Sequence, residues 1–61
     1  MRFVLKITEL GNDAFGDCPQ ACLAEVSRIL TQAAESVADG NSSGNLRDGN
    51  GNTVGFYEVT Q

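Results

Sequence analysis

The sequence has no histidine, a single lysine, a single tyrosine and only two cysteines among its 61 residues. Without histidine, two thiolates cannot complete a tetrahedral zinc site within one chain. The chain also lacks a G-x-S-x-G motif and a phosphate-binding loop, so nucleophilic and acid–base catalysis have no recognisable machinery. We therefore expect no enzymatic activity, no metal site and no cofactor.

The two cysteines, Cys18 and Cys22, are four residues apart in a segment that the sequence predicts to be helical. At that spacing their Cβ atoms lie about 6 Å apart, whereas an unstrained disulfide needs about 3.8 Å. Both cysteines extend the apolar stripe of the helix, and free cysteine packs as a small hydrophobe. Packing is the favoured interpretation. The alternatives are a reactive thiol at Cys18 near the helix N-terminus, a metal ligand or a disulfide.

The sequence also lacks long apolar runs and an excess of basic over acidic side chains. No run approaches the ~20 residues that a membrane-spanning helix needs, and residues 1–7 lack the apolar core and cleavage site of a secretory signal. We therefore expect a cytoplasmic protein with no membrane partner. Eight acidic and four basic side chains give a net charge of −4, which disfavours nucleic acid as a partner.

The clearest positive feature is an amphipathic helix between Asp17 and Gly40. Asp17 followed by Gln20 has the arrangement of a capping box, and Pro19 falls in the first turn, where its missing N–H costs nothing. Gly40 predicts a left-handed C-terminal cap. The predicted buried stripe recurs at helical spacing and consists of Cys22, Val26, Ile29, Leu30, Ala33 and Val37.

Strands are expected on both sides of this helix. Phe3, Leu5 and Ile7 alternate with Arg2, Val4, Lys6 and Thr8, as in a half-buried strand. After a flexible connector at 40–44, the pattern of residues 45–60 predicts a hairpin with a turn at 48–51. A calcium loop is the other interpretation of Asp48 and its neighbours, but the sixth and twelfth loop positions do not fit.

Gly55 predicts a β-bulge within the last strand and leaves its facing ambiguous. One facing turns Tyr57 and Val59 inward, and the other turns Val54 and Phe56 inward. We favour the first, with a bulge that also brings Val54 inward. In the loop before the helix, Ala14 and Phe15 could fold back over the start of the helix.

The predicted order is β-α-β-β, an α+β fold with one helix on one face of a three-stranded sheet, formed by residues 1–61 as a single domain. The other sheet face stays open. Because so short a chain buries little apolar surface, we also expect self-association, as a homodimer. The open face should carry Arg2, Val4, Lys6, Thr8, Asn45 and Arg47, and the favoured facing of the last strand adds Phe56 and Glu58.

The segment Gly44-Asn-Leu-Arg-Asp-Gly-Asn-Gly-Asn-Thr-Val-Gly55, which follows a helix ending in Ala38-Asp-Gly40, resembles the C-terminal half of short bacteriophage and prophage proteins. The resemblance implies a small accessory protein made in an infected bacterium. Small acidic phage proteins of this kind include inhibitors of host defence such as anti-CRISPR proteins, which occlude sites on host complexes. The resemblance transfers no functional residues.

Together these features predict a non-enzymatic protein that binds another protein, with inhibition of a host defence complex as the most concrete version. Two sets of residues are candidates for partner contact. The first is the acidic helix set Glu25, Glu35 and Asp39, and the second is the sheet set Lys6, Arg47 and Phe56. The alternatives are a module that binds single-stranded nucleic acid on the open sheet face and a structural or assembly protein of the virion.

Overall fold

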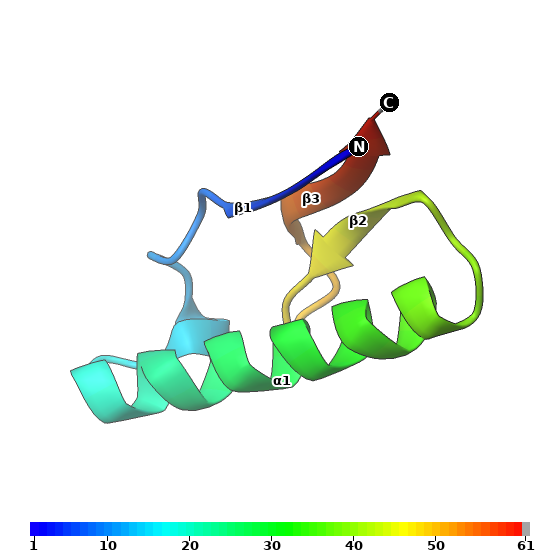
Figure 1. Cartoon of the computed structure of the whole chain (residues 1–61). Coiled ribbons are helices and arrows are strands. Elements are labelled where there is room, and N and C mark those ends of the chain that lie inside the picture. The colour runs from blue at the N-terminus through cyan, green and yellow to red at the C-terminus, as the bar shows by residue number, and fades with distance from the viewer. Residues whose placement is uncertain (61) are drawn as a thin grey trace.

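The computed structural model describes residues 1–60 and has the predicted α+β architecture, with one helix against a three-stranded antiparallel sheet (Figure 1). The helix runs between the first and second strands, and a short 3₁₀ turn precedes it. In chain order the elements are β1 (Arg2–Ile7), the 3₁₀ turn (Asp13–Phe15), α1 (Pro19–Ala38), β2 (Ser43–Arg47) and β3 (Thr53–Thr60).

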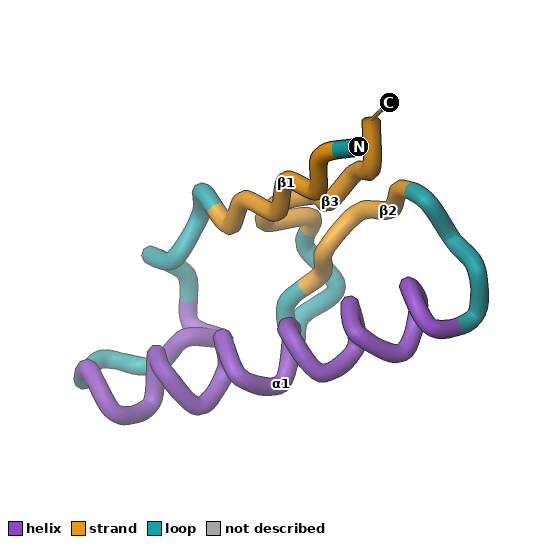
Figure 2. The backbone as a smooth tube through the Cα atoms, in the orientation of Figure 1, coloured by secondary structure: helices purple, strands orange, loops and turns teal. Residues whose placement is uncertain are grey.

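The last strand occupies the centre of the sheet, whose strand order is β1-β3-β2 (Figure 2). Both outer strands pair antiparallel with β3, so β1 and β2 run parallel to each other and each forms an edge. The connection through α1 therefore crosses β3 to reach the far edge. β2 begins at Ser43, so the prediction that residues 43 and 44 belong to a flexible connector is wrong.

The pairing register of β1 and β2 with β3 determines which side chains face the helix. Leu5 pairs with Tyr57, and Gly44 pairs with Tyr57 from the other side. Tyr57 is 2% exposed, which confirms the favoured facing of this strand. The pairing of β2 with β3 shifts between Leu46 and Arg47, and Val54, at this bulge, is buried as predicted.

The core lies between β2, β3 and the stretch of the helix from Cys22 to Ala33, and the 3₁₀ turn closes one end of it. Phe15 lies in that turn, has no exposed surface and is one of the largest fully buried side chains. It covers the start of the helix, as the sequence suggested. The buried hydrophobic residues are Phe15, Ile29, Ala33, Leu46, Val54 and Tyr57.

The two ends of the helix differ in how well the sequence predicted them. Cys18, not Asp17, is the N-cap residue, and its side chain makes no capping hydrogen bond, so the predicted capping box is wrong. At the other end Gly40 has a φ of 96°. Its N–H donates to Val37 O (2.9 Å) and that of Asn41 donates to Ser36 O (3.2 Å), which is a Schellman motif and confirms the predicted cap.

The helix packs against β2 and the 3₁₀ turn and makes few contacts with β1 (Figure 1). As a result only part of the predicted stripe is buried. Ile29 and Ala33 are in the core, but Leu30 and Val37 are 45% and 38% exposed. The radius of gyration is 11.9 Å, above the value of about 10.5 Å expected for a compact chain of this length.

Candidate functional site: the open sheet face

The face of the sheet opposite α1 is uncovered, and Phe56 lies at its centre. Phe56 is on the middle strand, where it pairs with Lys6 of β1 on one side and Asn45 of β2 on the other. Directly paired residues project to the same face, so these three side chains form one row across the sheet. Phe56 is 38% exposed. The structure thus brings together two residues of the predicted sheet set, Lys6 and Phe56.

The charges around this row are mixed. Arg2 and Lys6 project from β1 on the open face, but Glu58 projects to the same face from β3, opposite Val4. The third member of the predicted sheet set lies apart from the row. Arg47 follows the bulge, and its Nη1 donates to Gly51 O in the hairpin turn (3.2 Å).

The predicted acidic helix set is divided. Glu25 is engaged with the hairpin, because Arg28 donates two hydrogen bonds to its carboxylate (2.8 and 2.9 Å) and Gly49 N donates a third (2.6 Å). Only 11% of the Glu25 side chain is exposed. Glu35 and Asp39 are exposed one turn apart near the end of α1. Glu25 is therefore a contact between helix and hairpin, and of the predicted acidic helix set only Glu35 and Asp39 remain as exposed carboxylates.

The hairpin turn is organised by a buried carboxylate, Asp48, which is 5% exposed. Its Oδ1 accepts from the backbone N–H groups of Asn50 and Asn52, both at 2.9 Å, and its Oδ2 accepts from Asn12 Nδ2 at 2.6 Å. The contact with Asn12 ties the hairpin to the loop before the helix. These bonds occupy both carboxylate oxygens, and the segment is the predicted hairpin turn.

Both carboxylates at this junction have lowered pKa values. The side-chain hydrogen bonds from Arg28 are the main cause of the lowered pKa of Glu25; burial opposes them, and the Gly49 N–H adds to them. Burial raises the pKa of Asp48, but the hydrogen bonds from Asn52, Asn12 and Asn50 outweigh it and leave that pKa below its ordinary value.

These shifts predict that acid destabilises the fold through Glu25 and Asp48. A carboxylate with a lower pKa in the folded state stabilises the protein above its unfolded pKa, and this contribution is lost as the pH falls from about 5 through the folded values. Urea unfolding at a series of pH values should show this loss. It should become shallower in Asp48→Asn and Glu25→Gln, whereas Tyr57→Phe should keep the wild-type pH dependence. Identical slopes in all four proteins would contradict the assignment.

A second uncovered surface lies on the helix side of the sheet, where α1 leans away from β1. An apolar groove of about 360 Å³ separates the two elements. Phe3 and Leu30, on its two walls, are 51% and 45% exposed. We use the term β1 groove for the space lined by Phe3, Leu5, Leu30, Ala33, Ala34 and Val37. Sequence periodicity assigns all of these residues except Ala34 to the core and therefore misses the groove.

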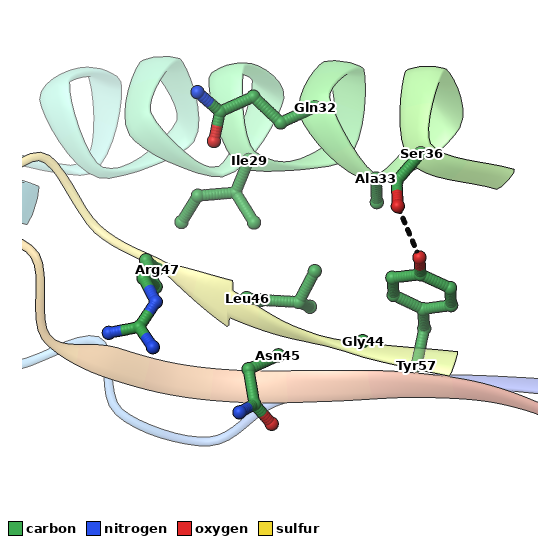
Figure 3. A pocket seen from close by; sticks show the side chains of 9 residues that line it. All are labelled: Ile29, Gln32, Ala33, Ser36, Gly44, Asn45, Leu46, Arg47 and Tyr57. Atoms are coloured by element: carbon green, nitrogen blue, oxygen red, sulfur yellow. Dashed lines mark hydrogen bonds between the residues drawn. The ribbon is translucent and has the colours of Figure 1, made fainter. Parts of the chain in front are cut away.

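A smaller hollow of about 160 Å³ lies between α1 and β2 (Figure 3). At one end of it Ser36 Oγ and the Tyr57 hydroxyl form a hydrogen bond of 2.5 Å. Gly44 makes room for the tyrosine, because a Cβ atom there would lie 2.8 Å from the ring. The polar side chains around this hollow include no nucleophile paired with a base, so it offers no visible catalytic arrangement.

The two cysteines occupy different environments, and both are free thiols. Cys22 is half-buried and packs against the core, in agreement with the packing interpretation. Cys18 is exposed, and as the N-cap residue it precedes the first helical turn. The prediction that Cys18 packs in the apolar stripe is therefore wrong.

No family model, curated protein or solved structure matches the chain. Within residues 1–60, the structure contains no helix with both the length and the apolar character needed to cross a membrane.

Proposed function

We propose that this protein acts by binding another protein, and that the open sheet face around Phe56 is its contact surface. The observation that carries the proposal is the position of Phe56, a large apolar side chain in the middle of an uncovered sheet face. Central aromatic residues surrounded by polar side chains are typical of the residues that dominate binding energy in protein interfaces. Lys6 and Asn45 flank Phe56 in this way.

The more specific proposal is inhibition of a bacterial defence complex in the cytoplasm of the host. It is supported by the resemblance of the segment 44–55 to short phage proteins and by the small size and net charge of −4. A protein of this kind needs a surface that occludes a site and requires no catalytic group. Glu35 and Asp39 form a second, weaker candidate surface for a basic partner.

The competing function is binding of single-stranded nucleic acid on the same face, because an exposed aromatic beside Lys6 offers a stacking platform. Glu58 on this face weakens that function. Anisotropy of a labelled single strand distinguishes the two: nucleic-acid binding should appear at low salt and fall by about 0.7 log units per log unit of salt for each phosphate contacted. We expect no binding at low salt.

Affinity capture from a bacterial lysate tests the protein-binding proposal with matched variants of the full chain. We expect Phe56→Ala to weaken binding by about 30-fold, the effect of losing a central aromatic worth roughly 2 kcal/mol. Lys6→Glu should also weaken it. The double variant Glu35→Lys and Asp39→Lys reverses the charges of the second, weaker surface, and capture should stay unchanged if the sheet face is the contact surface. Unchanged capture by Phe56→Ala, with native circular dichroism, would remove the sheet face from consideration.

A further inference from the structure

β1 leaves backbone hydrogen-bonding groups unpaired along its outer edge. Thr8 N–H donates to Val54 O (2.8 Å), and these two residues continue the β1–β3 register. In an antiparallel strand the amides alternate in direction, so the even-numbered residues of β1 bond to β3. The N–H and C=O groups of Phe3, Leu5 and Ile7 therefore point away from the sheet, toward its free edge.

The same three residues present their side chains on the helix side of the sheet, where Phe3 and Leu5 line the β1 groove, while Leu5 and Ile7 also pack against the core. Outward-pointing backbone groups, the exposed Phe3 side chain and the apolar β1 groove thus lie along one edge. The surface of the described chain is 4178 Å², compared with about 3,800 Å² expected for a folded monomer of this mass. A long apolar edge strand is normally paired or covered.

We propose that β1 pairs antiparallel with β1 of a second copy of this chain, about a two-fold axis that passes through Leu5 perpendicular to the sheet. In this register Leu5 lies opposite Leu5 of the second copy, and Phe3 lies opposite Ile7. Each of these apolar pairs uses the backbone groups that β3 leaves free. The two sheets become one sheet of six strands, with both helices on the same face and the two β1 grooves joined across the axis.

Charge selects this register. A two-fold axis through Val4 would place Arg2 directly opposite Lys6 of the second copy, and like charges at directly opposed positions are destabilising. With the axis at Leu5, Lys6 lies opposite Val4 and Arg2 lies opposite Thr8. If the register shifted by one residue, Phe3 of one copy and Ile7 of the other would lie on opposite faces of the joined sheet, since side-chain facing has a period of two.

A second copy fits this edge better than an unrelated strand does, because the apolar pattern of β1 is complementary to itself. A two-fold interface uses the same surface on both subunits. A standard interface buries about 800 Å² on each partner, roughly a fifth of this chain's surface. The six residues of β1 and the helical wall of the β1 groove supply a surface of that kind. The other edge strand, β2, carries Ser43, Asn45 and Arg47 and contacts the helix.

Sedimentation of the full chain tests the proposal with two matched leucines on α1. Leu30 lines the β1 groove, whereas Leu23, 66% exposed, does not. We expect the wild type and Leu23→Lys to sediment as dimers of a 6.5 kDa chain at high micromolar concentration, and Leu30→Lys as a monomer with native circular dichroism. A monomeric wild type, or a dimer that Leu30→Lys leaves intact, would overturn the proposal.

Amide hydrogen exchange measured by NMR tests the register itself. In the dimer the amides of Phe3, Leu5 and Ile7 should be protected, and in monomeric Leu30→Lys they should exchange freely while those of Val4 and Lys6 stay protected. A wild-type dimer with unprotected amides at these three odd positions would overturn the β1 pairing. Loss of dimerisation with retained partner capture through Phe56 would refute this inference alone, because the open sheet face does not depend on it.

Discussion

We expect Phe15→Ala to leave the chain largely unfolded at room temperature in the absence of denaturant. Phe15 has no exposed surface, and removing a buried phenylalanine costs about 3–5 kcal/mol. A chain of this length has a total stability of about 3–9 kcal/mol at typical values per residue. Because so short a chain buries little surface and lies near the lower end of that range, the loss consumes most or all of the free energy of unfolding.

Urea unfolding followed by circular dichroism measures this effect. Leu10→Ala is the matched control, because Leu10 is in the same loop but 44% exposed, and its replacement should change the free energy of unfolding by less than about 0.5 kcal/mol. If Phe15→Ala lost no more stability than Leu10→Ala, the assignment of the 3₁₀ turn to the core would be wrong.

The second large effect is expected at Gly55, in the central strand. A Cβ atom at this position would overlap the carbonyl oxygen of Lys6 and lie 2.9 Å from the Cα atom of Ile7. Both are backbone atoms of β1, so the added methyl group must push β1 away from β3. We expect Gly55→Ala to lower the free energy of unfolding by about 3 kcal/mol, the upper range for overpacking.

Gly11→Ala is the control for Gly55→Ala, since a Cβ atom at Gly11 meets nothing within 4 Å. This substitution should instead raise the free energy of unfolding by about 0.4–1 kcal/mol, because alanine restricts the unfolded chain. The two glycine-to-alanine changes should therefore have opposite signs in urea unfolding. A neutral or stabilising Gly55→Ala would contradict the close approach of β1 to β3.

Features set by local residue patterns could be predicted from the sequence. The alternation around Leu5 places that strand and its inner face, and the first glycine after the helical stripe, Gly40, places the helix end. Gly55 indicates the bulge because a glycine inside a run of strand formers marks a close backbone approach. In each case the signal and the structure it specifies lie within a few residues of each other.

Features that depend on long-range packing could not be predicted in the same way. Helical periodicity assigns Leu30 and Val37 to the buried face but does not specify how far the helix leans from β1, and this lean opens the groove. The contact of Asp48 with Asn12 spans 36 residues of sequence. The N-cap differs from the predicted one by a single position, because Cys18 and Asp17 both precede Pro19 and only backbone geometry separates them.

The candidate site was predictable where local patterns determine it and not where it depends on long-range packing. Strand alternation correctly placed Lys6 and Phe56 on one face, and the register showed that they are direct neighbours. The contact of Glu25 with Gly49 depends on the hairpin folding back onto the helix, which no local pattern indicates. Arg47 lies outside the row because it is two residues beyond Asn45 along β2, past the bulge, where it pairs with Thr53.

Photocrosslinking in living bacteria tests the central claim, that the sheet face around Phe56 contacts a protein partner. The full chain is expressed with p-benzoylphenylalanine in place of Phe56 and, in a matched strain, in place of Glu35. Our account predicts an adduct between the chain and another protein at position 56 and none at position 35. Adducts at position 35 with none at position 56 would contradict it.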